Sequence, residues 1–381
     1  MPGEAEVDDA DTLTPQDEAE LAEAIRAASG PLNITGGGTR PIGAPRAGRR
    51  LSTRGMRGIT LHEPGALTLV ARAGTPLAEV EAALAKAGQR LPFEPMDHRA
   101  LLNTTGEPTI GGVAAANVSG PRRIQVGACR DSLIGLRFVD GTGAIVKSGG
   151  RVMKNVTGFD LVRLLAGSFG TLGVLSEVAF KVLPASEAQA ALVLRGLDEA
   201  RAVQAMAAAL GAPYEVTGAA HLPGQGTYLR IEGFAESVEY RAARLADLLA
   251  PFGAAEILND AALVDAQWRD LRDVAAFHDR PGDVWRVSVK PSDGPDIVAR
   301  AQPLAHQFDW GGGLVWLLME DGCDLRARLG DIRGHATLVR AAPETRARLP
   351  AFQPEPAPIA ALASGLRARF DPRGLLNPGL M

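Results

Sequence analysis

Three clusters of glycine in the first half of the chain restrict the fold more than any other feature of the sequence. They span residues 36–38, 111–120 and 167–173, and each lies beside a segment that reads as a strand. Glycine permits positive φ, so successive backbone N–H groups can turn towards an anion and the chain can approach a flat ring closely. Three such clusters, interleaved with Ser, Thr and Asn, indicate one long ligand with an anionic centre.

Two common nucleotide-binding motifs are absent. A Rossmann site needs Gly-x-Gly-x-x-Gly between a strand and a helix, but the first cluster runs into Thr39, Arg40 and Pro41, and Pro41 prevents a normal helix start. The pattern Gly-x4-Gly-Lys-Ser/Thr does not occur, which argues against a P-loop NTPase. FAD is long enough for all three clusters and is anionic at its diphosphate.

The periodicity of apolar residues predicts an α+β protein with two lobes. Helices are expected over residues 15–28 (capped by Thr14), from Thr75-Pro76, and over 160–166, 198–210, 237–249, 296–306 and 358–370. Strands are expected over residues 32–34, 67–70, 133–139, 144–147, 174–183, 228–234, 284–290, 314–319 and 337–340. A lobe boundary near Pro184 divides the chain into an acidic tail at 1–13, a domain at 14–184, an α+β cap at 185–357, and a C-terminal helix with an Asn-Pro-Gly tail at 358–381 that returns to the first lobe. The domain at 14–184 holds all three glycine clusters and is therefore expected to be the FAD-binding domain.

Composition excludes several functional classes. The net charge is −4 and the basic residues are scattered, so no stripe suits a nucleic-acid backbone. The two cysteines, Cys129 and Cys323, are too few for a disulfide framework or for an iron–sulfur cluster, which takes four thiolates. The first 20 residues hold eight acids and no Lys or Arg, unlike a signal peptide, and no apolar run reaches the roughly 20 residues that span a bilayer. A cytoplasmic protein is expected.

Five segments resemble the vanillyl-alcohol oxidase (PCMH-type) family of FAD-binding proteins. They are residues 31–39, 109–122, 127–131, 158–161 together with 170–174, and 377–379. The resemblance implies a two-subdomain FAD lobe followed by a cap. It also implies non-covalent FAD, because Thr39 and Arg40 rather than a histidine follow Gly38. The residues that it assigns to FAD are Thr35, Gly36, Gly37, Gly38, Thr39, Gly111, Gly112, Asn117, Ser119, Gly120, Arg130, Asp131, Gly173 and Val174.

Two local strings, residues 91–95 and 152–160, resemble one branch of that family, the flavoprotein subunits of bacterial glycolate oxidases. Those subunits work with a larger catalytic flavoprotein and an iron–sulfur subunit. The resemblance therefore implies oxidation of glycolate to glyoxylate, with electrons passed to a partner, and it allows peripheral association with the inner face of the membrane through the complex. A stand-alone dehydrogenase of the D-lactate type and a subunit that no longer binds flavin are the alternatives.

Oxidation of a 2-hydroxy acid needs a cation for the carboxylate and a base for the hydroxyl proton. Arg286 is the candidate clamp, with an ordinary solvent-side strand arginine as the alternative. His278, with Arg269 and Arg272 nearby in the sequence, is the candidate base, although most histidines are surface or packing residues. No two of the six histidines lie close in sequence, so no metal site is expected. Lys154 is a further residue that could approach the flavin.

Overall fold

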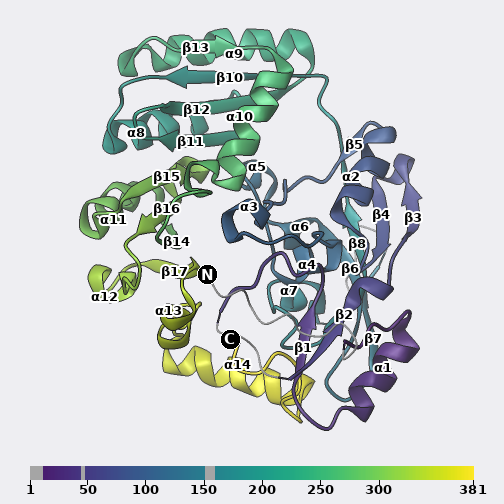
Figure 1. The fold of residues 1–381 in the computed structure, drawn as a ribbon. Helices are drawn as coiled ribbons and strands as arrows, with labels where there is room; N and C mark the ends of the chain where they lie inside the picture. The colour runs from purple at the N-terminus through teal and green to yellow at the C-terminus, as the bar shows by residue number, and fades with distance from the viewer. Residues whose placement is uncertain (1–11, 44–47, 151–158) are drawn as a thin grey trace.

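The computed structural model describes residues 12–43, 48–150 and 159–381, which form two lobes, each built on its own sheet (Figure 1). The first lobe holds a five-stranded antiparallel sheet, and we call it the five-strand lobe. Its strand order is β3 (Ile59–Glu63), β4 (Thr68–Arg72), β8 (Val174–Lys181), β6 (Leu133–Val139) and β7 (Ile145–Gly149). Residues 152–158 of the string 152–160, Lys154 among them, and the acids before residue 12 lie outside the described residues.

The core of this lobe forms where buried strand residues meet short helices. The helices are α2 (Leu77–Lys86), α4 (Ile110–Ala115) and α7 (Leu161–Leu165). The fully buried rings of Phe93, Phe138 and Phe180 fill the space between these elements. The turn between β6 and β7 closes because the Asp140 carboxylate accepts the N–H groups of Thr142 and Ala144 at 2.9 and 3.0 Å.

A smaller unit adjoins the same lobe. It consists of α1 (Glu18–Ala27), the parallel pair β1 (Leu32–Thr35) and β2 (Arg49–Ser52), and the C-terminal tail. The tail binds β1, because the Leu32 N–H donates to the carbonyl of Leu375 at 2.7 Å and the Asn377 N–H donates to the carbonyl of Leu32 at 3.0 Å. The predicted start of α1 was wrong: Asp17 rather than Thr14 is the cap, and its carboxylate accepts N–H groups of the first turn.

The second lobe, which we call the eight-strand lobe, is built on one antiparallel sheet. Its strand order is β13 (Glu256–Leu258), β10 (Ala188–Leu194), β12 (Gly226–Gly233), β11 (Gly218–Leu222), β15 (Ala305–Asp309), β16 (Leu314–Met319), β14 (Asp283–Val289) and β17 (Gly334–Arg340). One face packs against α8 (Glu199–Leu210), α9 (Ala235–Leu249), α11 (Gly294–Ala301) and α12 (Leu325–Leu329). The other face carries Val284, Trp316 and Val339 into the core of the five-strand lobe.

Three further features differ from what the sequence led us to expect. The helix expected over 296–306 ends at Ala301, because Gln302 takes φ of 48° and breaks the helix, so His306 lies on β15. Helix α10 (Ala261–Asp273) was not predicted. The second glycine cluster is not a plain loop, since α4 lies within it.

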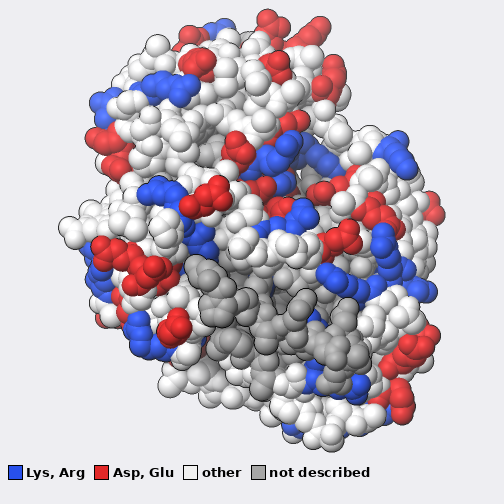
Figure 2. All heavy atoms as spheres, viewed as in Figure 1, with Lys and Arg blue, Asp and Glu red and all other residues white. Residues whose placement is uncertain are grey.

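Helix α14 (Ala357–Phe370) crosses the base of the molecule and has no buried residue (Figure 1). Three large aliphatic side chains, Ile359, Leu362 and Leu366, are 48%, 67% and 38% exposed, and Figure 2 shows a mainly uncharged surface there. None of the helices in the described ranges is long and apolar enough to cross a membrane.

Candidate functional site

The first glycine cluster follows β1 and presses against the backbone that precedes α4. A Cβ atom added to Gly37 would lie 1.5 Å from the carbonyl oxygen of Glu107, and one added to Gly36 would lie 2.4 Å from the Thr109 hydroxyl. No side chain fits at either position. Glycine is therefore required here for close contact between two loops that are about 70 residues apart in the sequence.

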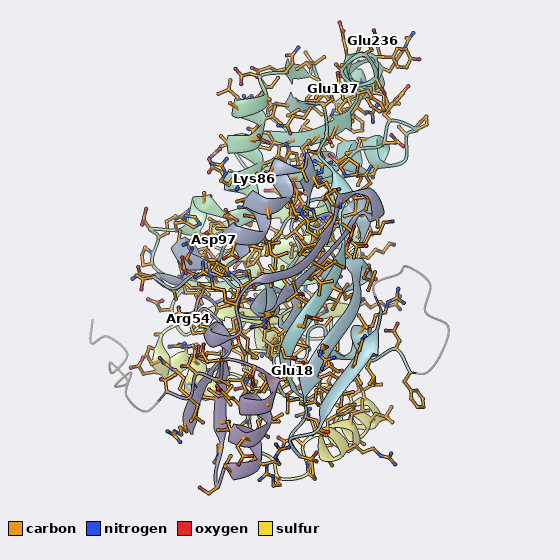
Figure 3. All side chains as sticks on the ribbon, turned by 90° about the vertical axis from the view of Figure 1, so that its right-hand side faces the viewer. Glu18, Arg54, Lys86, Asp97, Glu187 and Glu236 are labelled. Atoms are coloured by element: carbon orange, nitrogen blue, oxygen red, sulfur yellow. The ribbon has the colours of Figure 1, made fainter. Side chains whose placement is uncertain are left out.

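This loop has backbone donors that the protein does not use. The N–H groups of Gly37, Gly38 and Thr39 donate no hydrogen bond to any described residue. Gly38 has φ of 73°, and nothing lies within 4 Å of where its Cβ would be. Arg54, labelled in Figure 3, holds the loop from one side through a 2.9 Å hydrogen bond from Nη2 to the Gly37 carbonyl. The geometry suits an anion that accepts several amide hydrogens.

The second cluster has a different geometry. The N–H groups of Ile110 and Gly111 donate to backbone carbonyls, and the N–H of Gly112 donates to the Thr109 hydroxyl at 3.3 Å. A Cβ on Gly111 would lie 2.5 Å from the Cβ of Ala73. These glycines therefore bring α4 against the end of β4, and their own donors are already satisfied.

Asn117, Ser119 and Arg130 hold the chain that follows the second cluster. Asn117 has φ of 48°, and its Oδ1 accepts the Arg130 N–H at 3.0 Å. The Ser119 hydroxyl accepts the N–H of Cys129 at 3.0 Å. The Arg130 side chain is exposed, and Cys129 is fully buried, which raises the pKa of its thiol. Cys129 is thus a packed residue rather than a reactive thiolate.

The remaining predicted cofactor residues also fix the backbone. Asp131 Oδ2 accepts the N–H of Ala128 at 2.8 Å and closes the turn between α5 (Arg123–Val126) and α6 (Cys129–Ser132). A Cβ on Gly173 would lie 2.5 Å from the ring of Phe138, and Val174 begins β8 in register with Val139. Thr35 ends β1 directly before the free donors of the first loop.

Asn377 joins the tail to β1 and to the third glycine cluster. Its Oδ1 accepts the N–H of Ile34 at 2.7 Å, and its Nδ2 donates to the carbonyl of Phe169 at 2.8 Å. One buried amide thus bridges β1 and the third cluster. The Asn-Pro-Gly signature in the tail was visible in the sequence, but the residues that it connects were not.

Arg286 points from β14 towards the five-strand lobe and shares an aromatic ring with a second arginine. Its guanidinium lies 5.0 Å from the ring centre of Trp310, and that of Arg123 lies 4.7 Å from the same ring. Neither guanidinium makes an ion pair or a hydrogen bond with a described residue. Burial, and then the charge of Arg123, lower the pKa of Arg286 to about 10. Two cations without acidic partners on one ring make a site for an anion.

A third buried cation extends this site towards the first glycine cluster. Arg40 lies 5.3 Å from the ring centre of Phe169 and donates to the carbonyl of Ala116 at 3.3 Å, while its buried Nε has no partner among the described residues. Burial, and then the charge of Arg286, lower the pKa of Arg40 to about 9. The sequence offered one signal for this cation, because Arg40 stands two residues after Gly38 in the first glycine cluster.

Two histidines face the same group of cations. Burial is the largest cause that lowers the pKa values of His98 and His335, and the positive charge of Arg286 acts on both. His335 lies on β17 beside β14, where the pairing of Arg286 with Thr337 puts His335 on the same face of the sheet. Both imidazoles are therefore held in the neutral form, which can accept a proton.

His278 is bonded to the end of helix α10 rather than to this cluster. Its Nε2 is 2.8 Å from the carbonyl oxygen of Asp273, at the end of α10. No hydrogen bond or cation–π contact among the described residues joins His278 to Arg40, Arg123 or Arg286. The structure brings Arg286 into the cationic site but not His278.

A buried ion cluster joins the lobes beside this site. The two carboxylate oxygens of Glu94 each accept a hydrogen bond from Arg230 at 2.8 Å, and Arg122 bridges Glu94 and Glu232 at 3.1 and 2.6 Å. Arg90 also donates to Glu232, at 2.6 Å. Figure 2 shows basic and acidic side chains gathered along this boundary. In the described ranges no group of three or more His, Cys, Asp or Glu residues could hold a metal ion.

Comparisons with known proteins agree with this geometry. The FAD binding domain family matches residues 12–149, which include the first two glycine clusters. Alkyldihydroxyacetonephosphate synthase has a solved structure that is similar over 97% of this chain and 77% of that chain, with a TM-score of 0.71 and 16% identity. That likeness confirms the mixed α and β fold class.

Two relatives are similar in sequence. Glycolate oxidase subunit GlcD of Bacillus subtilis (strain 168) is 42% identical over 85 residues, which cover 22% of this chain and 18% of that protein. Glycolate oxidase subunit GlcE of Escherichia coli (strain K12) is 36% identical over 355 residues, which cover 92% of this chain and 92% of that subunit. The chain therefore belongs to the family of glycolate oxidase subunit GlcE, an FAD-linked oxidoreductase family, and its cofactor is FAD.

Proposed function

We propose that this chain is the FAD-binding subunit of a glycolate oxidase complex, in which glycolate is oxidised to glyoxylate and the electrons pass to a partner subunit. The observation that carries the proposal is the pair of adjacent anion sites. The free N–H groups of the first glycine loop suit a diphosphate, and the unpaired Arg286 and Arg123 suit a carboxylate.

FAD, when bound, supplies the acceptor for the hydride that leaves the α-carbon of the hydroxy acid. The first loop holds the cofactor without a covalent bond, since Thr39 and Arg40 rather than a histidine follow Gly38. Arg40, whose buried Nε has no partner among the described residues, offers one more donor beside that loop.

The cationic site binds and orients the substrate. Arg286 holds the carboxylate, because a guanidinium can donate two parallel hydrogen bonds to it. His335 accepts the hydroxyl proton, because it is neutral and lies on the same face of the sheet as Arg286. His278 remains the alternative base, and its bond to the carbonyl of Asp273 would have to break first.

The electrons leave through other subunits: a larger flavoprotein and an iron–sulfur protein. The sequence holds only Cys129 and Cys323, fewer than one cluster takes. The aliphatic stripe of α14 supports assembly, since Ile359, Leu362 and Leu366 are exposed on a helix that buries none of its residues.

Expression of the chain alone and with its two neighbours tests this proposal. The chain alone is expected to be yellow, to release FAD on denaturation, and to stay oxidised when glycolate is added without oxygen. The assembled complex is expected to bleach with glycolate. Bleaching of the lone chain by D-lactate would favour the stand-alone dehydrogenase, and a folded protein that stays colourless with excess FAD would refute FAD binding.

A further inference from the structure

Trp310 lies in the turn between β15 and β16, where the eight-strand lobe meets the second glycine cluster. Its backbone takes φ of 54°, in the left-handed region that tryptophan rarely adopts. Gly311 and Gly312 follow with φ of 68° and 102°. The Asp309 carboxylate accepts the Trp310 N–H at 2.7 Å and holds this strained turn in place.

The indole N–H reaches across the boundary between the lobes. Trp310 Nε1 donates to the carbonyl oxygen of Gly120, at the end of the second glycine cluster, over 3.0 Å. The rest of Gly120 is already fixed: its N–H donates to Phe93 at 2.8 Å, and a Cβ would lie 2.2 Å from the carbonyl oxygen of Glu94. A shift of Trp310 would therefore be transmitted to this loop.

The ring of the same residue supports the two unpaired arginines. Arg123 comes from the five-strand lobe, three residues after Gly120, and Arg286 comes from β14. Each guanidinium lies at most 5.0 Å from the ring centre, and no acid pairs with either among the described residues. Attraction to the electron-rich ring holds both cations at this residue against their mutual repulsion.

We propose that Trp310 is a positioning residue that couples the two anion sites: its N–H fixes the glycine loop that borders FAD, and its ring orients Arg286 and Arg123 for the substrate carboxylate. The coupling rests on the proposed function of the chain as an FAD-binding oxidoreductase subunit. The indole N–H and the aromatic ring have separate roles, so a mutation can remove the N–H and keep a ring.

Trp285 provides a matched control. It lies on β14 next to Arg286 and also carries an arginine, with Arg326 at 4.9 Å from its ring centre. Its ring packs on the opposite face of the sheet, in the core formed with the helices, and its buried Nε1 has no hydrogen-bond partner among the described residues. Trp285→Phe thus removes an indole N–H that makes no contact with a glycine loop.

The test uses FAD-loaded Trp310→Phe, Trp310→Leu and Trp285→Phe proteins. FAD retention is measured as the fluorescence of FAD released on dilution. Anion binding is measured as the change in flavin absorbance on titration with oxalate, which carries carboxylates but no oxidisable C–H bond. Trp310→Phe is expected to weaken FAD binding about fivefold, the effect of one lost hydrogen bond, and to leave oxalate affinity within about twofold.

Trp310→Leu is expected to weaken oxalate binding about fivefold as well, because the arginines lose the ring, whereas Trp285→Phe should change neither affinity. The coupling would be overturned if Trp310→Phe bound FAD as tightly as the wild type does. It would also be overturned if Trp310→Phe and Trp310→Leu lost FAD affinity and oxalate affinity to the same extent. Trp310→benzothienylalanine, which keeps the shape and lacks the N–H, gives the same comparison if the Phe variant does not fold. A wild-type chain that binds no FAD would instead refute the proposed function.

Discussion

Glu94→Gln is the substitution that best tests how the two lobes are held together. The Glu94 carboxylate accepts four hydrogen bonds of 2.8–3.1 Å, from the side chains of Arg230 and Arg122 and from the Arg122 N–H. Burial alone would raise its pKa, but the charges and hydrogen bonds of Arg230 and Arg122 lower the pKa to about 2 from 4.5. The ionised form is therefore strongly favoured in the folded protein.

The lowered pKa gives the size of the effect. A difference of about 2.5 pKa units at about 1.4 kcal/mol each corresponds to about 3 kcal/mol. Removing one partner of a buried ion pair costs a similar amount, because the other charge stays buried. The entropy of unfolding for 381 residues is about 0.8 kcal/mol/K, so the melting temperature is expected to fall by about 4 °C at pH 7.

The dependence of stability on pH distinguishes the loss of this ion cluster from a packing defect in Glu94→Gln. Because the folded pKa of Glu94 lies below the unfolded value, its contribution is fully present above pH 4.5 and is lost as the pH falls towards 2. Thermal unfolding followed by circular dichroism should thus show the deficit of Glu94→Gln at pH 7 and a shrinking deficit below pH 4.5. The control is Glu79→Gln, whose pair with Arg57 is more exposed and is worth under about 1 kcal/mol. An equal effect of the two variants at pH 7, or a deficit that persists in acid, would refute the reasoning.

Three further outcomes are expected. Gly37→Ala should have a melting temperature well below that of Gly38→Ala. The added Cβ at residue 37 would lie 1.5 Å from the Glu107 carbonyl oxygen, whereas nothing lies within 4 Å of a Cβ at residue 38. Equal melting temperatures would contradict the close approach of the two loops. Asp309→Asn should gain up to about 4 kcal/mol of stability relative to wild type as the pH rises from 4 to 7, because burial raises the pKa of Asp309 to about 7 from 3.8. Over that range the wild-type group ionises in the unfolded chain but stays protonated in the folded protein, and wild-type stability falls. Urea midpoints of the two proteins that differ equally at pH 4 and pH 8 would exclude this explanation. Arg286→Lys should raise the KM of the assembled complex for glycolate about tenfold with FAD retained, since lysine lacks the two-pronged donor, and an unchanged KM would remove Arg286 from the substrate site.

The glycine clusters show where sequence reasoning succeeded and where it was incomplete. Their residue type is a local property, because a position that a Cβ would block must be glycine in any fold of this kind. Their roles are not local. The N–H groups of Gly111 and Gly112 are satisfied within the protein, whereas those of Gly37 and Gly38 are not bonded to any described residue. Which donors stay free depends on the chain that folds against each loop.

The charged residues of the boundary were hardest to foresee. Glu94 lies in one of the recognised strings, and Arg230 lies on a strand that was expected, yet they are 136 residues apart and meet only when the lobes dock. The aliphatic surface of α14 is the converse case, because the sequence predicts that helix but does not tell which of its faces is covered.

The sequence by itself determined that this chain has an α+β fold with glycine loops for FAD, because backbone conformation, apolar periodicity and the absence of competing motifs are written in neighbouring residues. Only the tertiary structure decided that Arg40, Arg123 and Arg286 come together around Trp310 and Phe169, with neutral His98 and His335 facing them. The physical reason is that charge, burial and unpaired donors are properties of an environment, and that environment is formed by segments from both lobes.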